Sequence, residues 1–286
     1  MFFCIRLVGV VALSVFVAAC NNAALPVASQ GVAVAAATDK ALAELAKRAT
    51  DGDPGAQFGL GNRYMNGAGV PRDVAEAVAW YQKSAAQGFH YAQVNLGNLY
   101  ADGVGVPKDI AKAVEWYQIA AIQGDPLAQT SLGNLYWKGE GVVKDDAEAM
   151  RWFEKAAVQG VAEAQNFLAY GYRTGGGMDK DPASAVAWYK KAAAQGVENA
   201  QLNLGVIYLN GDGIRADSVL ACAWFEIVAA STDPSWREQG AAERDIVVHK
   251  MTATEIAEAN ALSSAWKKGQ GLRRAAAAAG ATVKKT

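Results

Sequence analysis

The sequence predicts an all-α protein, a solenoid built from antiparallel helix pairs. Residue types recur every 36 positions through five consecutive copies, without insertion or deletion. A fixed period of this length indicates structural repeats that stack on one another. Within each copy, apolar residues recur at helical spacing on both sides of a glycine-rich turn, so each copy is expected to contribute two helices. The step is seen most directly in Trp80, Trp116, Trp152, Trp188 and Trp224.

The first copy shows how the first helix and the turn are expected to form. Ala56, Leu60 and Tyr64 fall on one face of a helix that runs from roughly residue 54 to 66. The segment 67–71 reads Gly-Ala-Gly-Val-Pro. It is expected to be a turn, because glycine supplies positive φ and proline cannot continue the helix.

The second helix of the copy follows this turn. Asp73 is expected to cap its first turn, with Glu76 completing a capping box, and Gly88 is expected to end it. Its predicted buried face holds Val74, Ala77, Val78, Tyr81 and Ala85. The repeated Trp is expected to be inter-helix core rather than a ligand site. A repeated glutamine, Gln57 in the first copy, is expected to bond to the backbone between repeats.

These residues and their spacing resemble the Sel1-like repeat, a relative of the tetratricopeptide repeat. The matching pattern is A-x-x-x-L-G-x-x-Y-x-x-G-x-G-V, then D, then A-x-x-W-Y-x-x-A-A-x-x-G, and it covers about residues 53–232. Copy four departs from it at Ala169 and Met178, and copy five departs at Ile214 and Thr232. The resemblance implies a right-handed superhelix whose concave face is used for protein contacts.

The segments that flank the repeats are expected to cap or extend them. Residues 38–52 match the second half of a repeat and are expected to form an N-terminal capping helix. Residues 233–268 are expected to form C-terminal capping helices, with Asp233 and Thr252 at two helix starts. Residues 21–37 are interpreted as a flexible tether, and residues 269–286 as a disordered tail.

Residues 1–20 resemble a bacterial lipoprotein signal peptide. Residues 7–19 form an uncharged run that ends in small residues before Cys20, and this run is too short to span a bilayer core of about 30 Å. The resemblance implies that Cys20 is acylated and holds the protein at a membrane surface. The alternative is an ordinary secretory signal that is cut after Ala19. We therefore expect an exported protein of the bacterial cell envelope, at the periplasmic face of a membrane as a lipoprotein.

Charge and residue content exclude several kinds of chemistry. A formal net charge of −1 does not supply the basic face that nucleic-acid binding needs. His90 and His249 are far apart in the sequence and accompany no Cys/His cluster, so we expect neither a metal nor another cofactor. Ser264 and Lys267 match a penicillin-recognising motif without its partner motifs. No catalytic residue is assigned, the protein is expected not to be an enzyme, and Cys222 is expected to be a small core residue.

The candidate binding surface is the part of each first helix outside its core-facing arc, which lines the concave groove in a tetratricopeptide-like stack. Its repeated asparagines are able to pair with an extended peptide backbone. The alternative is that they are only soluble residues on a wet face. Aromatic neighbours are candidate anchors. The predicted partner-binding residues are Phe58, Asn62, Tyr91, Asn98, Asn134, Trp137, Tyr170 and Arg173. Replacing Asn98, Asn134 or Tyr170 is expected not to unfold the protein.

These observations favour a membrane-tethered scaffold or adaptor of the cell envelope that binds a protein or peptide in its concave groove. One alternative is an envelope hydrolase of the β-lactamase-like or peptidoglycan-acting kind, an activity assigned to some Sel1-like proteins. A second alternative is a regulator of a periplasmic sensor or protease. The sequence does not identify the partner.

Overall fold

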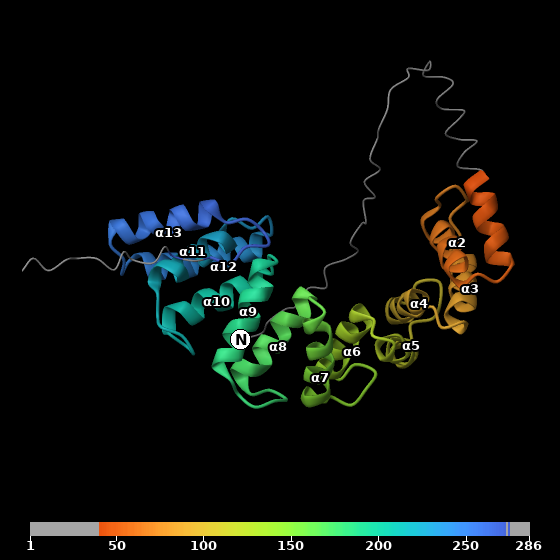
Figure 1. The fold of residues 1–286 in the computed structure, drawn as a ribbon, viewed down its shortest axis with the longest axis horizontal. Helices are drawn as coiled ribbons and strands as arrows, with labels where there is room; N and C mark the ends of the chain where they lie inside the picture. Colours follow the sequence, from red (N-terminus) through yellow and green to blue (C-terminus); the bar gives the residue numbers. More distant parts are fainter. Residues whose placement is uncertain (1–39, 273, 275–286) are drawn as a thin grey trace, which may run out of the picture. The chain divides into compact units, whose positions relative to one another are not determined.

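The computed structural model describes residues 40–272 and 274, and within them the protein is an all-helical solenoid of consecutive helix pairs (Figure 1). The chain divides into two units, Met1–Glu44 and Leu45–Thr286. In the first unit residues 40–44 are described and are helical, and in the second the helical conformation continues from residue 45 to residue 50. The predicted signal peptide, Cys20 and the tether lie outside the described residues.

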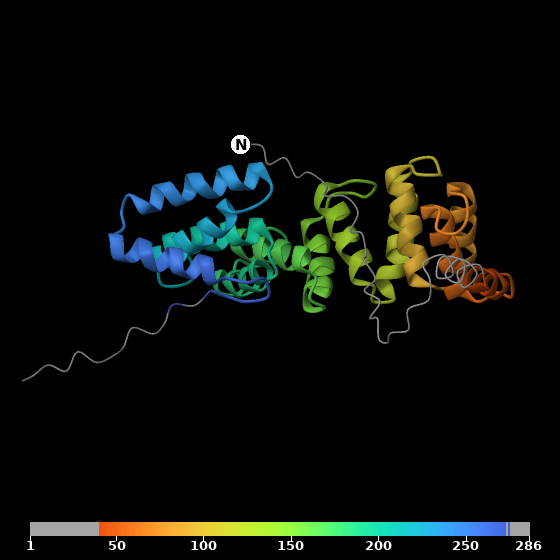
Figure 2. The same cartoon turned by 90° about the horizontal axis from the view of Figure 1, so that it is seen from above.

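Five helix pairs follow one another along the chain, as Figures 1 and 2 show from two directions. Each helix packs mainly on the helix before it and the helix after it. The pairs are α2 (Pro54–Asn66) with α3 (Val74–Ala86), α4 (His90–Asp102) with α5 (Ile110–Ile122), α6 (Pro126–Lys138) with α7 (Asp146–Val158), α8 (Ala162–Thr174) with α9 (Pro182–Ala194), and α10 (Glu198–Asn210) with α11 (Ser218–Ala229). Two further helices, α12 (Pro234–Val248) and α13 (Ala253–Ala265), both pack on α11. No helix of the described part is long and apolar enough to cross a membrane.

An aspartate begins the second helix of every pair. The carboxylates of Asp73, Asp109, Asp145, Asp181 and Asp217 each accept a hydrogen bond from a backbone N–H of the following first turn. The side chain therefore satisfies a donor that the helix itself leaves unpaired. The capping box predicted at Asp73 is only half formed, because Glu76 donates its backbone N–H to Asp73 and no return bond is present. A complete capping box occurs at Thr252 and Glu255, at the start of α13.

Each Gly-x-Gly turn has two separate tasks. The first glycine ends the first helix in the left-handed region, as Gly67 does at φ 68°. The second glycine allows the loop to approach the preceding pair. At Gly141, a Cβ atom would lie 2.6 Å from Cγ2 of Ile110, which is closer than real carbon atoms pack. The glycine spacing therefore serves both the turn and the stacking of neighbouring repeats.

The aromatic core position is the residue after the repeated Trp. Tyr81, Tyr117, Phe153, Tyr189 and Phe225 are each at most 5% exposed. Of the repeated tryptophans, only Trp152 and Trp224 are buried, and the other three are partly buried. The prediction that the Trp side chains form the core is therefore correct for two copies and too strong for Trp80, Trp116 and Trp188. In three copies a lysine three residues later covers the Trp ring, as Lys191 does at 3.7 Å from the Trp188 ring centroid.

Glutamines form the predicted polar connection between repeats. Gln93 Nε2 donates to the backbone carbonyl of Ala85 at 3.2 Å, and Gln123 Nε2 donates to Gln93 Oε1 at 2.7 Å. Equivalent amide–carbonyl bonds are formed by Gln57, Gln129, Gln165 and Gln201. The side chains are buried, so these bonds hold successive pairs in one register. Cys222 is also buried, as predicted, and burial raises the pKa of its thiol to about 11.

Candidate partner-binding surface

The predicted binding residues of the first two repeats gather into an aromatic cluster. The Phe58 ring lies 5.4 Å from the Phe89 ring and 6.0 Å from the Tyr91 ring, measured between centroids. Tyr91 is 51% exposed, so one side of the cluster faces solvent. Beside it, His90 Nδ1 lies 2.9 Å from Oδ2 of Asp125. Asp125 also caps α6, so this histidine contacts a structural carboxylate.

The first two asparagines of the predicted ladder have a structural role that the sequence analysis did not foresee. The Tyr81 hydroxyl donates to Asn62 Oδ1 at 2.7 Å, and the Tyr117 hydroxyl donates to Asn98 Oδ1 at 2.6 Å. Each asparagine therefore satisfies the polar end of a buried tyrosine on the second helix of its own pair. One lone pair of its carbonyl oxygen is therefore already used inside the pair. Replacing Asn98 is therefore expected to remove the bond to Tyr117 and to cost about 0.5–1.5 kcal/mol, and that it does not unfold the protein stays a prediction.

The third asparagine differs because its pair lacks the tyrosine. Phe153 stands at that core position, and its ring stacks on Phe167 with 4.6 Å between centroids. Asn134 instead directs its Nδ2 toward Oε1 of Glu163 at 3.4 Å. The three asparagines therefore occupy one repeat position but have two kinds of partner.

A second cluster, which we call the α6–α8 surface, contains Trp137, Phe167, Tyr170 and Arg173. The rings of Trp137 and Tyr170 meet edge to face at 5.7 Å, and Trp137 lies 6.5 Å from Phe167. The Arg173 guanidinium carbon lies 5.4 Å above the Tyr170 ring. Lys144 approaches the Trp137 ring at 5.6 Å. The structure thus brings together the last three predicted residues, Trp137, Tyr170 and Arg173, with two cations against the aromatic rings.

Polar atoms without partners are concentrated on the same repeat. Among the described residues, Asn166 Oδ1, Arg173 Nε and the Tyr189 hydroxyl are buried atoms that have no hydrogen-bond partner. Tyr189 stands where Tyr81 and Tyr117 stand in their own pairs, but Tyr170 replaces the asparagine that would accept its proton. Burial raises the pKa of Tyr189, and the nearby Arg173 offsets part of that rise. Such unsatisfied groups cost stability, so the fourth repeat is packed less favourably here than the first two.

Phe167, Glu163 and Tyr189 were not predicted as part of this surface. The 36-residue register indicates Tyr189, which follows Tyr170 by 19 positions. Tyr81 and Tyr117 follow Asn62 and Asn98 by the same step and bond to them. Ser264 and Lys267 are both exposed, and no hydrogen bond joins them in the part of the chain that is described. That part also contains no group of three or more His, Cys, Asp or Glu side chains able to hold a metal ion.

Comparisons with known proteins identify the family. A family profile described as Sel1 repeat matches residues 54–89, 90–125, 126–161, 162–197 and 199–233. No match was found among curated proteins. A solved Sel1 repeat protein from Oxalobacter formigenes is 35% identical, with a TM-score of 0.62 over 70% of this chain and 80% of that one.

The chain is also similar to c5321, a protective antigen present in uropathogenic Escherichia coli strains that displays an SLR fold. The identity is 32% and the TM-score 0.56, over 80% of this chain and 56% of that one. This chain therefore spans little more than half of that relative. The five matched segments cover most of the described residues, and the chain belongs to the Sel1 repeat family, whose repeats generally act as scaffolds for protein–protein interaction.

Proposed function

We propose that this protein is a lipoprotein of the bacterial cell envelope that binds a protein or peptide partner on its α6–α8 surface. The proposal has two parts, an anchor at Cys20 and a binding surface on the repeats. Each part rests on separate observations and is tested separately.

One observation carries the binding part. At the α6–α8 surface, Tyr170 is 37% exposed next to Trp137, and Arg173 Nε has no hydrogen-bond partner among the described residues. Exposed aromatic residues and arginine are the residue types that contribute most to binding energy at protein interfaces. In the first two repeats the equivalent positions, Asn62 and Asn98, are used for internal hydrogen bonds to a buried tyrosine. In the fourth repeat Tyr170 stands at this position and does not form the bond. We take this as favouring a role for Tyr170 in contact with another molecule.

Charge at this surface indicates the chemistry of the partner. Lys144 and Arg173 lie against the aromatic rings. Arg173 forms no ion pair within the described residues, whereas Lys144 is paired with Asp146 at 2.6 Å. Arginine binds planar carboxylates through two parallel hydrogen bonds. We therefore expect a segment that places an acidic side chain at Arg173 and an apolar side chain against Trp137 and Tyr170.

The anchor part rests on residues 1–20, where an uncharged run ends in small residues before Cys20. An acyl chain on Cys20 would leave the repeats in water beside the membrane. Two modest interactions, one with lipid and one with a partner, then reinforce each other through a raised local concentration. This arrangement suits an adaptor in the envelope.

Photo-cross-linking in intact cells tests the binding part. A photoreactive phenylalanine analogue at position 170 is expected to give a discrete cross-linked product that mass spectrometry can identify. The control carries the same analogue at position 246, where Ile246 is 55% exposed on α12, outside the five repeats. Products of equal amount and identity at positions 170 and 246 would mean that contact is not specific to the α6–α8 surface.

A further inference from the structure

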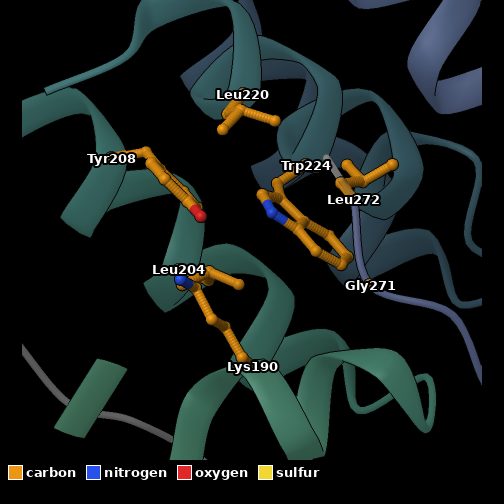
Figure 3. Close-up of a pocket in the computed structure, with 7 residues that line it drawn as sticks. All are labelled: Lys190, Leu204, Tyr208, Leu220, Trp224, Gly271 and Leu272. Atoms are coloured by element: carbon orange, nitrogen blue, oxygen red, sulfur yellow. The ribbon is translucent and has the colours of Figure 1, made fainter. Parts of the chain in front are cut away.

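A pocket of about 340 Å³ lies between the last two helix pairs and the chain segment that follows α13. It is lined by Lys190 from α9, Leu204 and Tyr208 from α10, Leu220 and Trp224 from α11, and Gly271 and Leu272 from the following segment (Figure 3). Pockets for small organic ligands have volumes from about 300 to 1,000 Å³, so this one is large enough for a compact molecule.

The wall made by Gly271 and Leu272 is fixed by polar contacts on both sides. Gly269 donates its backbone N–H to the carbonyl of Ala194 at 2.6 Å. Arg274 lies 2.8 Å from Glu258 and 3.2 Å from Asp217, and these two carboxylates raise the pKa of its guanidinium. The segment was predicted as part of a tail, and its first residues instead close one side of the pocket.

Two of the three polar side chains that line the pocket, Trp224 and Lys190, are donors only, and the third, Tyr208, has a hydroxyl that both donates and accepts. Trp224 is 2% exposed, and its indole N–H has no hydrogen-bond partner among the residues that the structure describes. In the described part of the chain, the Lys190 ammonium has no ion pair, and its nitrogen lies 5.7 Å from the Tyr208 ring centroid. In Figure 3 the Tyr208 oxygen and the Trp224 nitrogen face each other across the pocket, and Lys190 reaches the same space from α9.

The two donor-only side chains favour an anion, and the Tyr208 hydroxyl is able to donate a hydrogen bond to it as well. Indole and ammonium groups donate hydrogen bonds and cannot accept them. Among the described residues no carboxylate lines the pocket, and Asp217 and Glu258 are engaged by Arg274. The remaining lining consists of Leu204, Leu220 and Leu272, which favour an apolar body.

We propose that this pocket binds a monocarboxylate with a compact apolar body, whose carboxylate accepts hydrogen bonds from Trp224 and Lys190. The same chemistry is presented by a free carboxylic acid of medium chain length and by a peptide that ends in an apolar residue. This pocket lies on α9–α11 and does not depend on the α6–α8 surface.

Calorimetric titration of the purified chain tests the proposal with three probes: sodium decanoate, the tripeptide Ala-Ala-Leu, and the same tripeptide as its C-terminal amide. At least one of the two carboxylates is expected to bind saturably with one site per chain, and the amide is expected to bind at least tenfold more weakly than the free tripeptide or not at all. Saturation by decanoate alone identifies a free acid as the source of the ligand. Saturation by the tripeptide alone identifies a peptide terminus, and saturation by both supports the shared chemistry. If neither carboxylate saturates, the proposal is wrong.

Matched lysine variants locate the site. Lys190 is exposed at the pocket mouth, so Lys190→Gln is expected to keep the melting temperature and to weaken carboxylate binding at least tenfold. Lys191→Gln is the control, because Lys191 lies over the Trp188 ring and does not line the pocket. Equal affinities of the two variants would overturn the assignment.

The indole resonance reports contact directly. In nitrogen-15 spectra, the Trp224 side-chain signal is identified by its loss in Trp224→Phe. Saturating carboxylate is expected to move this signal downfield, as a new hydrogen bond requires. A signal that stays in place while decanoate or the tripeptide saturates would show that the ligand binds elsewhere.

Discussion

Gly97→Ala tests the packing of the helix pairs at its tightest point. Gly97 lies in α4, facing Tyr117 of α5, and a Cβ added there would lie 2.5 Å from Cε1 and 2.7 Å from Cδ1 of that ring. The ring cannot withdraw freely, because Tyr117 is 5% exposed and its hydroxyl donates to Asn98 Oδ1 at 2.6 Å. The substitution therefore displaces the ring and breaks this hydrogen bond.

The expected free-energy change combines three effects. Overfilling a packed core costs about 1–3 kcal/mol, and loss of one hydrogen bond costs about 0.5–1.5 kcal/mol. Alanine recovers about 1 kcal/mol of helix propensity relative to glycine. The net expectation is a loss of roughly 2 kcal/mol in the free energy of unfolding, or about 4–8 °C in melting temperature.

Urea unfolding of Gly97→Ala measures this loss, and Gly59→Ala is the matched control. The nearest atom to a Cβ at position 59 is Leu45 Cδ1 at 3.2 Å, the mobile end of a flexible side chain. Gly59→Ala should therefore be neutral or up to about 1 kcal/mol stabilising. If Gly97→Ala is as stable as Gly59→Ala, the close contact does not constrain the pair.

Three further predictions concern the core, the pH dependence and the anchor. Trp224 is buried, so Trp224→Ala is expected to lower the free energy of unfolding in urea by about 3–5 kcal/mol. Trp116 is only partly buried, and Trp116→Ala is expected to lower it clearly less. Equal losses in the two variants would contradict the difference in burial. Burial raises the pKa of Tyr117 to about 12 from an ordinary value of 10.0. Between these two values the folded protein keeps a proton that the unfolded chain loses, so the free energy of unfolding should fall between about pH 10 and 12. The fall should be less steep in Tyr117→Phe, and identical pH profiles of urea unfolding for this variant and the unchanged protein would refute the prediction. Cys20→Ala is expected to move the protein from the membrane fraction to the soluble fraction and to abolish palmitate labelling; retained label would disprove acylation at Cys20.

The repeat architecture was largely predictable because each element depends on local rules. The 36-residue step, the turn glycines and the aspartate caps all act within a few residues of one another, and α2 has the bounds that the sequence predicts. The glutamine bonds were also predictable, because a polar residue that recurs beside an apolar arc needs a buried partner. The capping box at Asp73 was predicted incorrectly. Glu76 has the right spacing, but its side chain stays in solvent and does not bond back to the backbone of Asp73.

The candidate surface was less predictable because it depends on pairs of positions on different helices. Periodicity places Asn62 and Asn98 outside the core arc, but only the packing of two helices brings them to Tyr81 and Tyr117. The same limit applies to the tryptophans, because two adjacent residues on a helix point in directions about 100° apart and only one of them faces the partner fully. The pocket near Trp224 required the chain after α13 to return to the repeats, which no periodic pattern indicates.

The affinity of the cross-linked partner for two arginine variants tests the proposed function most directly. Arg173→Gln removes the guanidinium group from the α6–α8 surface, and a charged hydrogen bond contributes about 1.5–3 kcal/mol. Binding is therefore expected to weaken at least tenfold. Arg151→Gln is the control, since Arg151 is exposed on α7 and pairs with Glu148 of the same helix. A tenfold or greater loss confined to Arg173→Gln supports partner binding at this surface. Equal affinity of the two variants would contradict it.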